Sequence, residues 1–170
     1  MIFILTGFMA AGKTTVGKRA ALSLSIPFYD LDDLIEARAS QKIHDIFATS
    51  GESAFRKIES EIFAELLKSC PDECLISVGG GLIISDENFA RISSSEVVIF
   101  LDEDFEPIKK RIRADRTIRP VARDLNDQQL KALYERRRRI YLERSGFIVK
   151  NEIELVNLIK QQLNWKQKND

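Results

Sequence analysis

Gly7-Phe8-Met9-Ala10-Ala11-Gly12-Lys13-Thr14, near the start of the chain, fits the pattern GxxxxGK[ST]. The apolar run Ile2–Leu5 precedes this motif, and residues 16–22 after it have the composition of a helix. A strand, the motif and a helix in this order are the context of a P-loop, which binds nucleotide phosphates. The alternative is a glycine-containing turn followed by a surface lysine. Because strand and helix flank the motif as a P-loop requires, we favour a nucleotide-binding α/β fold.

The motif supplies a role for each fixed position. Gly7 and Gly12 allow the backbone to curl, so that consecutive N–H groups face one point. The first N–H groups of the following helix and the positive end of its dipole add to the same anion site. Lys13 is expected to reach the β- and γ-phosphates of ATP, and the Thr14 hydroxyl to bind Mg²⁺.

Composition limits the other possibilities. The chain has 170 residues, which suits one domain, and its 26 basic and 26 acidic residues give a net charge of zero. A general nucleic-acid binder would usually carry a basic excess. No apolar run approaches the length of a membrane span, and we expect no signal peptide, so a cytoplasmic enzyme is predicted. Cys70 and Cys74 are the only cysteines, and one such pair without histidine partners is a poor metal site. His44 is the only histidine, so we do not expect histidine catalysis.

Apolar runs and helical periodicity predict alternating strands and helices. The predicted strands are 1–6, 28–29, 74–78, 96–101 and 147–149. The predicted helices include 34–39, 52–69, 127–144 and 153–165. Ligands of an open parallel sheet bind beyond the carboxyl ends of its strands, so the residues that follow each strand are candidates for a binding site.

Acidic residues follow the second predicted strand. Asp30 and Asp32 alternate with Leu31, so one face can carry both carboxylates in the crevice of the P-loop. There they would act on magnesium or on a substrate. The alternative is that Asp32 or Asp33 only caps the next helix; we expect one of them to do so, which leaves another aspartate free.

Gly79-Gly80-Gly81 follows the third predicted strand. Three glycines remove every side chain at a place where backbone could approach a ligand, and we favour this function over that of a flexible turn. Arg56 and Glu59 are three residues apart on one predicted helix and are expected to form an ion pair, which by itself is an ordinary surface feature.

Two runs of basic residues occur in the second half of the chain. Lysines and arginines at 109, 110, 111, 113, 116 and 119 form a segment that we predict to be mobile, folding over phosphates as a lid. Nucleic acid or an acidic partner is the alternative explanation. In the second run, Arg136–Arg139, helical spacing allows at most one or two side chains to enter a site.

Taken together, these motifs resemble the shikimate kinase family over nearly the whole chain. The matching stretches are GFMAAGKTTVGK at 7–18, FYDLD at 28–32, FRKIE at 55–59, SVGGG at 77–81, RP at 119–120, and Tyr141 with Arg137. The resemblance implies a P-loop NTPase fold of the nucleoside-monophosphate-kinase type. Its five-stranded parallel sheet, in the order 2-3-1-4-5, would be flanked by helices in a single domain over 1–170. A substrate-binding insert at about 32–60 and a mobile lid at about 109–124 would complete that domain.

The resemblance also implies transfer of the ATP γ-phosphoryl group to the 3-hydroxyl of shikimate. Asp32, Lys13 and Arg119 would be catalytic, and Thr14 and Asp30 would bind Mg²⁺, Asp30 through water. The ATP site would comprise Gly7, Ala10, Ala11, Gly12, Lys13, Thr14, Thr15 and Arg119. Shikimate would contact Asp32, Arg56, Gly79, Gly80, Gly81 and Arg137.

Some features depart from the family pattern. Ala10 stands where a glycine is common, and we expect it to be tolerated there with a negative φ. Arg139 stands where many members have proline. Either Arg111 or Arg113 would contact adenine, and the spacing does not choose between them. We expect a monomer without nucleic-acid or membrane partners. The alternative functions are a gluconate or nucleoside-monophosphate kinase, or a nucleotide-dependent nucleic-acid-binding module.

Overall fold

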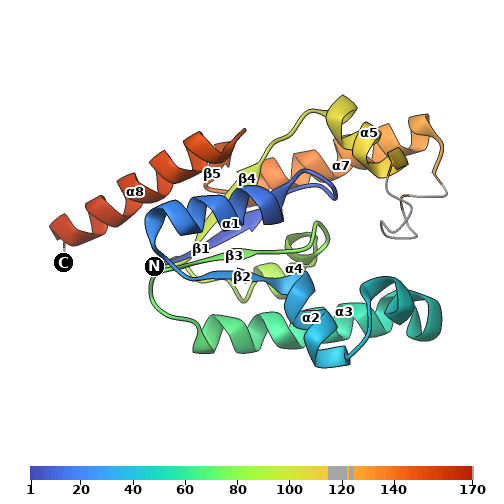
Figure 1. Cartoon of the computed structure of the whole chain (residues 1–170), viewed down its shortest axis with the longest axis horizontal. Helices are drawn as coiled ribbons and strands as arrows, with labels where there is room; N and C mark the ends of the chain where they lie inside the picture. Colours follow the sequence, from blue (N-terminus) through green and yellow to red (C-terminus); the bar gives the residue numbers. More distant parts are fainter. Residues whose placement is uncertain (115–121, 123–124, 170) are drawn as a thin grey trace.

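The computed structural model describes residues 1–114, 122 and 125–169. These residues form a five-stranded sheet with the order β2-β3-β1-β4-β5, in which all neighbouring strands are parallel. The expected fold class and strand order are therefore confirmed (Figure 1). The strands are β1 (Ile2–Thr6), β2 (Phe28–Asp30), β3 (Cys74–Ser77), β4 (Val97–Leu101) and β5 (Phe147–Val149).

Helices connect and cover the strands. In Figure 1, α1 and α8 lie side by side on one side of the strands, and α7 lies behind the strands. Both termini lie at the end of the sheet opposite to the P-loop. No helix within the described ranges is long and apolar enough to cross a membrane. The helices are α1 (Lys13–Leu24), α2 (Leu31–Ala39), α3 (Ile43–Ser69), the 3-10 helix η1 (Leu82–Ile84), α4 (Asp86–Phe89), α5 (Phe105–Ala114), α7 (Asp127–Arg144) and α8 (Glu152–Asn169).

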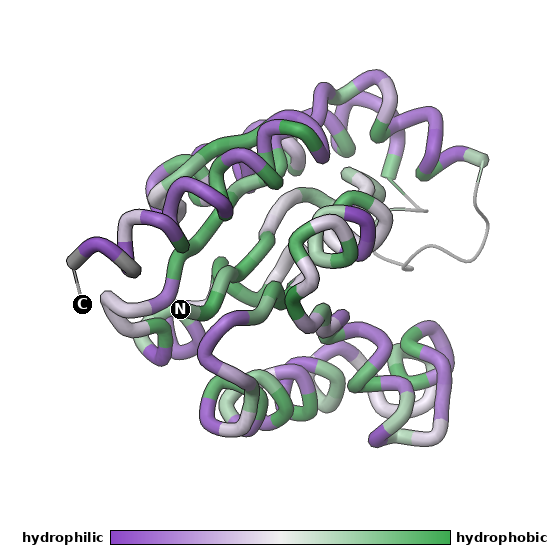
Figure 2. The backbone as a smooth tube through the Cα atoms, turned by 60° about the vertical axis from the view of Figure 1, so that its left-hand side comes forward, coloured by the Kyte–Doolittle hydropathy of each residue, from purple (hydrophilic) through white to green (hydrophobic). Residues whose placement is uncertain are grey.

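The central strand β1 anchors the core. It pairs with β3 on one side and β4 on the other, and Phe3, Ile4 and Leu5 have no exposed surface. Burying each such side chain contributes about 1.5–3 kcal/mol. Figure 2 shows hydrophobic residues concentrated along the strands and hydrophilic ones along the outer turns of the helices. The P-loop follows β1 directly and therefore lies at the middle of the carboxyl edge of the sheet.

Ala10 adopts a left-handed backbone conformation, with a φ of 59°. The expectation of a negative φ at this position is wrong. A hydrogen bond offsets part of the cost of this conformation, because the carbonyl of Ala10 accepts from Nη1 of Arg111 at 2.9 Å. The turn is closed by the N–H of Ala11, which donates to the carbonyl of Phe8 at 3.2 Å.

Asp30 is the N-cap of α2, which begins at Leu31 rather than at the predicted residue 34. The Asp30 carboxylate accepts from the N–H of Asp32 at 3.0 Å. Asp32 and Asp33 lie in the first turn, where the helix dipole favours negative charge. The expectation that Asp32 or Asp33 caps the helix is therefore wrong, because the chain enters the helix directly from β2.

The predicted insert, residues 32–60, comprises nearly all of α2, the part of α3 before Gly51 and the beginning of the part after it. Gly51 interrupts α3 with a φ of 79° and a ψ of 174°, and the helix after it matches the predicted span 52–69. In this second part, Phe55, Ile62 and Leu66 are buried, as their spacing predicts. The kink at Gly51 turns the first part of α3 back toward α2 (Figure 1).

The first residues of the predicted lid belong to a helix that packs on the core. Residues 109–114 are the end of α5, in which Ile108 and Ile112 are buried. These two isoleucines are four residues apart and hold the helix on the core, although its remaining face is basic. Residues 109–114 thus belong to a helix that packs on the core, although we predicted a mobile segment from residue 109 onward. Arg119 and most of the rest of the predicted lid, 115–121 and 123–124, lie outside the described residues.

Replacing Ser25 or Ser40 by glycine is expected to stabilise the protein. Both serines end helices with left-handed angles, φ 55° and φ 51°. This conformation costs an L-residue about 1–2 kcal/mol, and the flexibility of glycine in the unfolded chain costs about 0.5–1 kcal/mol. Each substitution should therefore raise the free energy of unfolding by about 0.5–1 kcal/mol, and the melting temperature by about 1–4 °C.

Thermal unfolding followed by circular dichroism measures these shifts. The matched control is Ala37→Gly, at an exposed helical position of α2, where a glycine should lower stability by about 1 kcal/mol. A fall in melting temperature for Ser25→Gly and Ser40→Gly as well as for the control would contradict the argument.

Candidate active site

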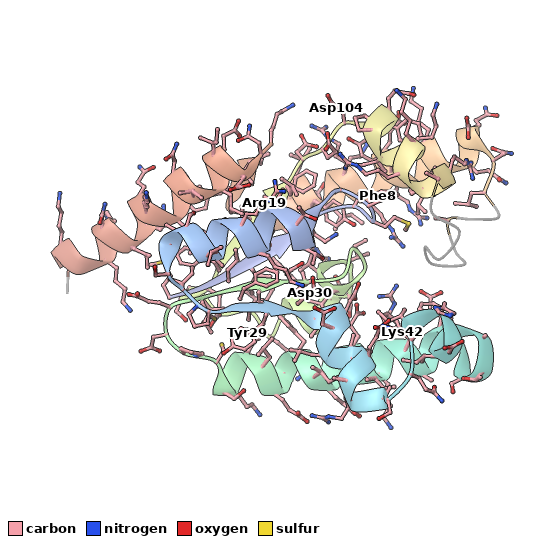
Figure 3. All side chains as sticks on the ribbon, in the orientation of Figure 1. Phe8, Arg19, Tyr29, Asp30, Lys42 and Asp104 are labelled. Carbon is pink, nitrogen blue, oxygen red and sulfur yellow. The ribbon has the colours of Figure 1, made fainter. Side chains whose placement is uncertain are left out.

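A cleft of about 870 Å³ opens at the carboxyl edge of the sheet. The P-loop, the junction of β2 and α2, the glycine segment after β3, the start of α3 and the end of α5 all contribute to its walls. Figure 3 labels Phe8 in the P-loop, Asp30 at the end of β2 and Lys42 at the start of α3, which surround this region. Predicted site residues that line the cleft are Ala10, Gly12, Lys13, Thr14, Thr15, Asp30, Asp32, Gly79 and Gly80.

The P-loop is held tightly by its own backbone and by β4. A Cβ atom at Gly7 would lie 2.8 Å from the carbonyl oxygen of Leu101, so no other residue fits there without displacement. Gly12, with a φ of 94°, is the N-cap of α1. Nζ of Lys13 donates to the carbonyls of Gly7 and Phe8, at 3.0 Å each. The lysine ammonium is thus curled over the loop at the N-terminal end of α1, where anions bind.

Thr14 and Asp30 meet in the cleft. The hydroxyl of Thr14 donates to Oδ2 of Asp30 at 2.6 Å. Asp30 is only 8% exposed, and burial raises the pKa of its carboxyl above the usual 3.8, although the hydrogen bond from Thr14 lowers it. Mg²⁺ prefers oxygen ligands and often takes only one or two from the protein, with the rest from water and phosphate. The converging oxygens of these two side chains fit that requirement.

The glycine segment touches the P-loop directly. A Cβ atom at Gly80 would lie 2.9 Å from the carbonyl oxygen of Gly7 and 3.4 Å from the backbone nitrogen of Met9. Gly79 and Gly80 are buried and line the cleft beside Asp32. The missing side chains therefore allow the backbone of this segment to approach the P-loop, and its approach to a ligand stays a prediction.

Arg56 lies against the last residue of the glycine segment. Its Nη1 donates to Oε2 of the fully buried Glu59 at 2.6 Å, and Nη2 donates to Glu52 at 3.1 Å. A Cβ atom at Gly81 would lie 2.5 Å from that same Nη1. The predicted ion pair is therefore present, and it holds the guanidinium against Gly81, next to the glycines that line the cleft.

Helix α7 carries the other predicted guanidinium. Cζ of Arg137 lies 5.9 Å from the centre of the Phe8 ring, so this arginine stacks over the P-loop. In the same run, Arg138 forms two hydrogen bonds with Asp102, at 2.8 and 2.6 Å, and Asp102 is only 6% exposed. Arg136 and Arg139 are exposed. Two members of the run thus contact the fold, and entry of either one into the site stays a prediction.

The structure distinguishes the two arginines that the sequence left open. Arg111 lines the cleft and donates to Ala10 in the P-loop and to Glu103. Arg113 donates to Asp127 and to the carbonyl of Leu125, at the start of α7. Both arginines lie on α5, and only the rotation of that helix on the core decides which one faces the nucleotide loop.

Several cleft residues were not predicted. Glu36, Lys42 and His44 line the cleft from the α2–α3 connection, where Nζ of Lys42 donates to Glu36 at 2.6 Å. Met9 and Ser77 also line it. Met9 and Ser77 belong to the motifs at 7–18 and 77–81, although no role was predicted for them. No motif marks Glu36, Lys42 or His44, and the only signal for them is their position in the predicted insert.

Comparisons with known proteins agree with this geometry. Residues 9–165 match the protein-family model described as "Shikimate kinase". The shikimate kinase of Enterococcus faecalis is 34% identical over 165 residues, which span 94% of this chain and 96% of that protein. The structure of shikimate kinase from Acinetobacter baumannii in complex with shikimate covers 99% of this chain, and this chain covers 94% of it, with a TM-score of 0.81 and 28% identity. The Aquifex aeolicus shikimate kinase structure gives a TM-score of 0.75 and 34% identity, with 99% of this chain and 98% of that one covered.

Asp30→Asn is expected to raise the stability of the ligand-free protein at pH 7. Burial disfavours the charged carboxylate in the folded state. Asparagine keeps one oxygen that can accept from the Asp32 N–H, and its NH2 group can donate to the hydroxyl of Thr14 in place of the present hydrogen bond. Because the folded pKa is raised, the cost of the charge is complete above that pKa and disappears as the pH falls toward 3.8.

Melting temperatures of both proteins across pH 3.5–7.5 measure the effect, which should shrink as the solution becomes more acidic. The exposed variant Asp33→Asn serves as the control and should show no such trend. An advantage of Asp30→Asn that grows on acidification would contradict the argument.

Proposed function

The chain belongs to the shikimate kinase family, and we propose that it transfers the γ-phosphoryl group of ATP to the 3-hydroxyl group of shikimate. The products would be shikimate 3-phosphate and ADP, in the biosynthesis of aromatic amino acids. One observation carries the proposal most directly: the P-loop, Asp32 and the glycine segment line a single cleft in a chain that matches shikimate kinases along nearly its whole length.

The P-loop and its surroundings would bind ATP. Lys13 already lies over the loop carbonyls and would move to the β- and γ-phosphates, where its ammonium offsets negative charge. Arg111 rather than Arg113 would lie beside the nucleotide, since Arg113 is engaged with Asp127. The role of Arg119 in bridging the phosphates from a lid remains a prediction, because this residue lies outside the described part of the chain.

Thr14 and Asp30 would hold the magnesium ion that accompanies ATP, Asp30 through water. When bound, this ion neutralises charge on the β- and γ-phosphate oxygens. The raised pKa of Asp30 has a direct consequence here, because protonation removes the charge that attracts the cation. Binding of the cation should therefore weaken at a higher pH than it would with an ordinary aspartate.

The acceptor would lie on the other side of the same cleft. Arg56 and Arg137 would bind the shikimate carboxylate, since planar guanidinium groups match the geometry of a carboxylate. The backbone of Gly79–Gly81 would approach the ring, and Asp32 would accept the proton of the attacking hydroxyl. Glu59 would act by holding Arg56 in place, which the 2.6 Å hydrogen bond between them supports.

We further propose a cytoplasmic monomer that needs no nucleic-acid or membrane partner. The sequence alone allows the basic runs to be assigned to nucleic acid, but several of their described members are engaged within the fold. Arg138 contacts Asp102 and Arg113 contacts Asp127, each through more than one hydrogen bond. Such internal pairs reduce the positive surface that a phosphate backbone could use.

A coupled assay of ADP release tests the proposed reaction. The purified protein would be given Mg²⁺, ATP and, in separate reactions, shikimate, gluconate or a nucleoside monophosphate. We expect rapid turnover with shikimate alone. Turnover with one of the other acceptors and none with shikimate would identify a related kinase instead. Tight, steeply salt-dependent binding of oligonucleotides without turnover would favour the nucleic-acid-binding alternative.

Asp32→Asn is expected to lower kcat by about 10²–10⁴-fold, because the amide cannot accept the hydroxyl proton. The Kd for ATP should stay close to that of the wild type, since the P-loop is unchanged. Steady-state kinetics and nucleotide binding by calorimetry measure the two effects. Asp33→Asn, at the neighbouring position, is the matched control and should retain activity. Near-normal turnover by Asp32→Asn would disprove its assignment as the base.

Gly81→Ala is expected to raise the KM for shikimate by about 10–100-fold, the range for losing a hydrogen bond to a charged group. The φ of Gly81 is −103°, so alanine suits the backbone, but its methyl group would displace the guanidinium of Arg56. The KM for ATP and the melting temperature should change little.

Gly146→Ala is the matched control for this experiment. A Cβ atom there meets only the carbonyl oxygen of Val98, at 3.9 Å, and we expect kinetics like those of the wild type. An unchanged KM for shikimate in Gly81→Ala would show that Arg56 does not bind the acceptor.

A further inference from the structure

One face of α7 lies against the carboxyl edge of the sheet. Tyr134, Arg137, Arg138, Tyr141 and Arg144 recur at spacings of three or four residues and so share this face. Tyr134 donates to the carbonyl of Glu103 at 2.9 Å, and Arg138 binds Asp102, which together fix the helix on the residues after β4. Tyr141 and Arg144, on the same face, contact a different segment.

Tyr141 holds the middle of the glycine segment. It is fully buried, and its hydroxyl donates to the carbonyl of Gly80 at 2.5 Å, while its ring packs on Phe100 with 5.1 Å between ring centres. A Cβ atom at Gly80 would lie 3.1 Å from this hydroxyl and 2.9 Å from the carbonyl oxygen of Gly7. Gly80 is therefore held between α7 and the P-loop.

Arg144 holds the continuation of the same segment. Nη1 donates to the carbonyls of Ile83 and Ile84, at 2.8 and 3.2 Å, and Nη2 donates to the carboxylate of Asp86. Its Cζ lies 4.9 Å from the centre of the Phe89 ring. The two carbonyls are at the C-terminal end of η1, where a helix leaves acceptors to be satisfied and favours a cation. The Arg144 side chain is 22% exposed, so most of this contact is shielded from solvent.

Backbone hydrogen bonds connect η1 to the glycines. The N–H of Leu82 donates to the carbonyl of Gly79 at 3.1 Å, and the N–H of Ile84 donates to the carbonyl of Gly81 at 3.2 Å. A displacement of η1 would therefore displace the glycine segment that lines the cleft.

We propose that Tyr141 and Arg144 are positioning residues for the acceptor, which hold the segment Gly79–Ile84 at a fixed distance from Arg137. The inference rests on the proposed function, in which the glycine segment and Arg137 bind shikimate from two sides. One helix carries Arg137 and both of these side chains, so the two halves of the acceptor site are joined through α7. The P-loop depends on β1 and β4 for its own position, and nucleotide binding does not require Tyr141 or Arg144.

The test is a kinetic comparison of Tyr141→Phe, Arg144→Met and Arg144→Lys with the wild type. In Tyr141→Phe, the ring still packs on Phe100 but the hydrogen bond to Gly80 is lost. In Arg144→Lys, a cation remains at the end of η1, but the guanidinium that donates to the carbonyls of both Ile83 and Ile84 is lost. We expect the KM and Kd for shikimate to rise roughly tenfold in Tyr141→Phe and Arg144→Met, because small displacements of positioning groups have effects of this size or larger. Arg144→Lys should recover part of the affinity. The KM for ATP should stay within about twofold of the wild type.

A purely structural role would give a different result. If the two side chains only stabilise the fold, the variants should have a lower melting temperature and a smaller fraction of active protein. The apparent kcat would then fall, while the KM values for shikimate and for ATP would stay unchanged. Amide hydrogen exchange adds a second readout, since exchange at residues 81–85 should accelerate in Arg144→Met and that of the P-loop should not. Arg139→Met, exposed on the same helix, is the matched control and should behave as the wild type.

The outcomes separate this inference from the function on which it rests. If the wild type phosphorylates shikimate but folded Tyr141→Phe and Arg144→Lys keep wild-type affinity for it, the inference is wrong and the function stands. Equal rises in the KM for ATP and for shikimate would also overturn it. If the wild type does not phosphorylate shikimate, the proposed function itself fails. Should Arg144→Met not fold, Tyr141→Phe and Arg144→Lys decide the question.

Discussion

The contact between the P-loop and the glycine segment leaves no room for a methyl group. A Cβ atom at Gly80 would lie 2.9 Å from the carbonyl oxygen of Gly7, and one at Gly7 would lie 2.8 Å from that of Leu101. The segments that follow β1, β3 and β4 thus contact one another through backbone atoms, with no side chain between them. This close approach places the phosphate-binding loop and the predicted acceptor site in one cleft. Phosphoryl transfer depends mainly on such positioning, since the protein contributes little covalent chemistry to it.

Two residues near this contact are in energetically unfavourable states. Asp30 is buried with a raised pKa, and Ala10 adopts a left-handed backbone conformation. Neither feature favours stability by itself, because buried charge and left-handed angles each cost free energy. Both occur in the cleft, where Asp30 meets Thr14 and the carbonyl of Ala10 meets Arg111. Functional sites commonly retain such costs when the surrounding packing is sufficient to hold them. Here that packing is the buried central strand and the helices that cover it.

The arginines of α5 and α7 show why charge in a sequence is a weak guide to charge on a surface. As runs of residues they are typical of a nucleic-acid-binding surface. In the structure, Arg138 is paired with the nearly buried Asp102, Arg144 binds backbone carbonyls, and Arg111 bridges the P-loop and Glu103. Each arginine presents several donors in a planar fork, so one side chain can join two segments of backbone. Their shared function within the described residues is to join α5 and α7 to the carboxyl edge of the sheet.

The sequence alone determined the nucleotide loop, the fold class, the strand order through the family resemblance, and part of the set of residues that line the cleft. These features depend on local rules, because glycine positions and apolar runs constrain the backbone wherever they occur. Only the tertiary structure decided that Asp30 caps α2, that Ala10 is left-handed, and that Arg111 rather than Arg113 faces the P-loop. It also decided that Tyr141 and Arg144 hold the glycine segment, more than fifty residues away in the chain. Such contacts depend on how a whole helix is rotated and seated on the core, and no local pattern encodes that orientation.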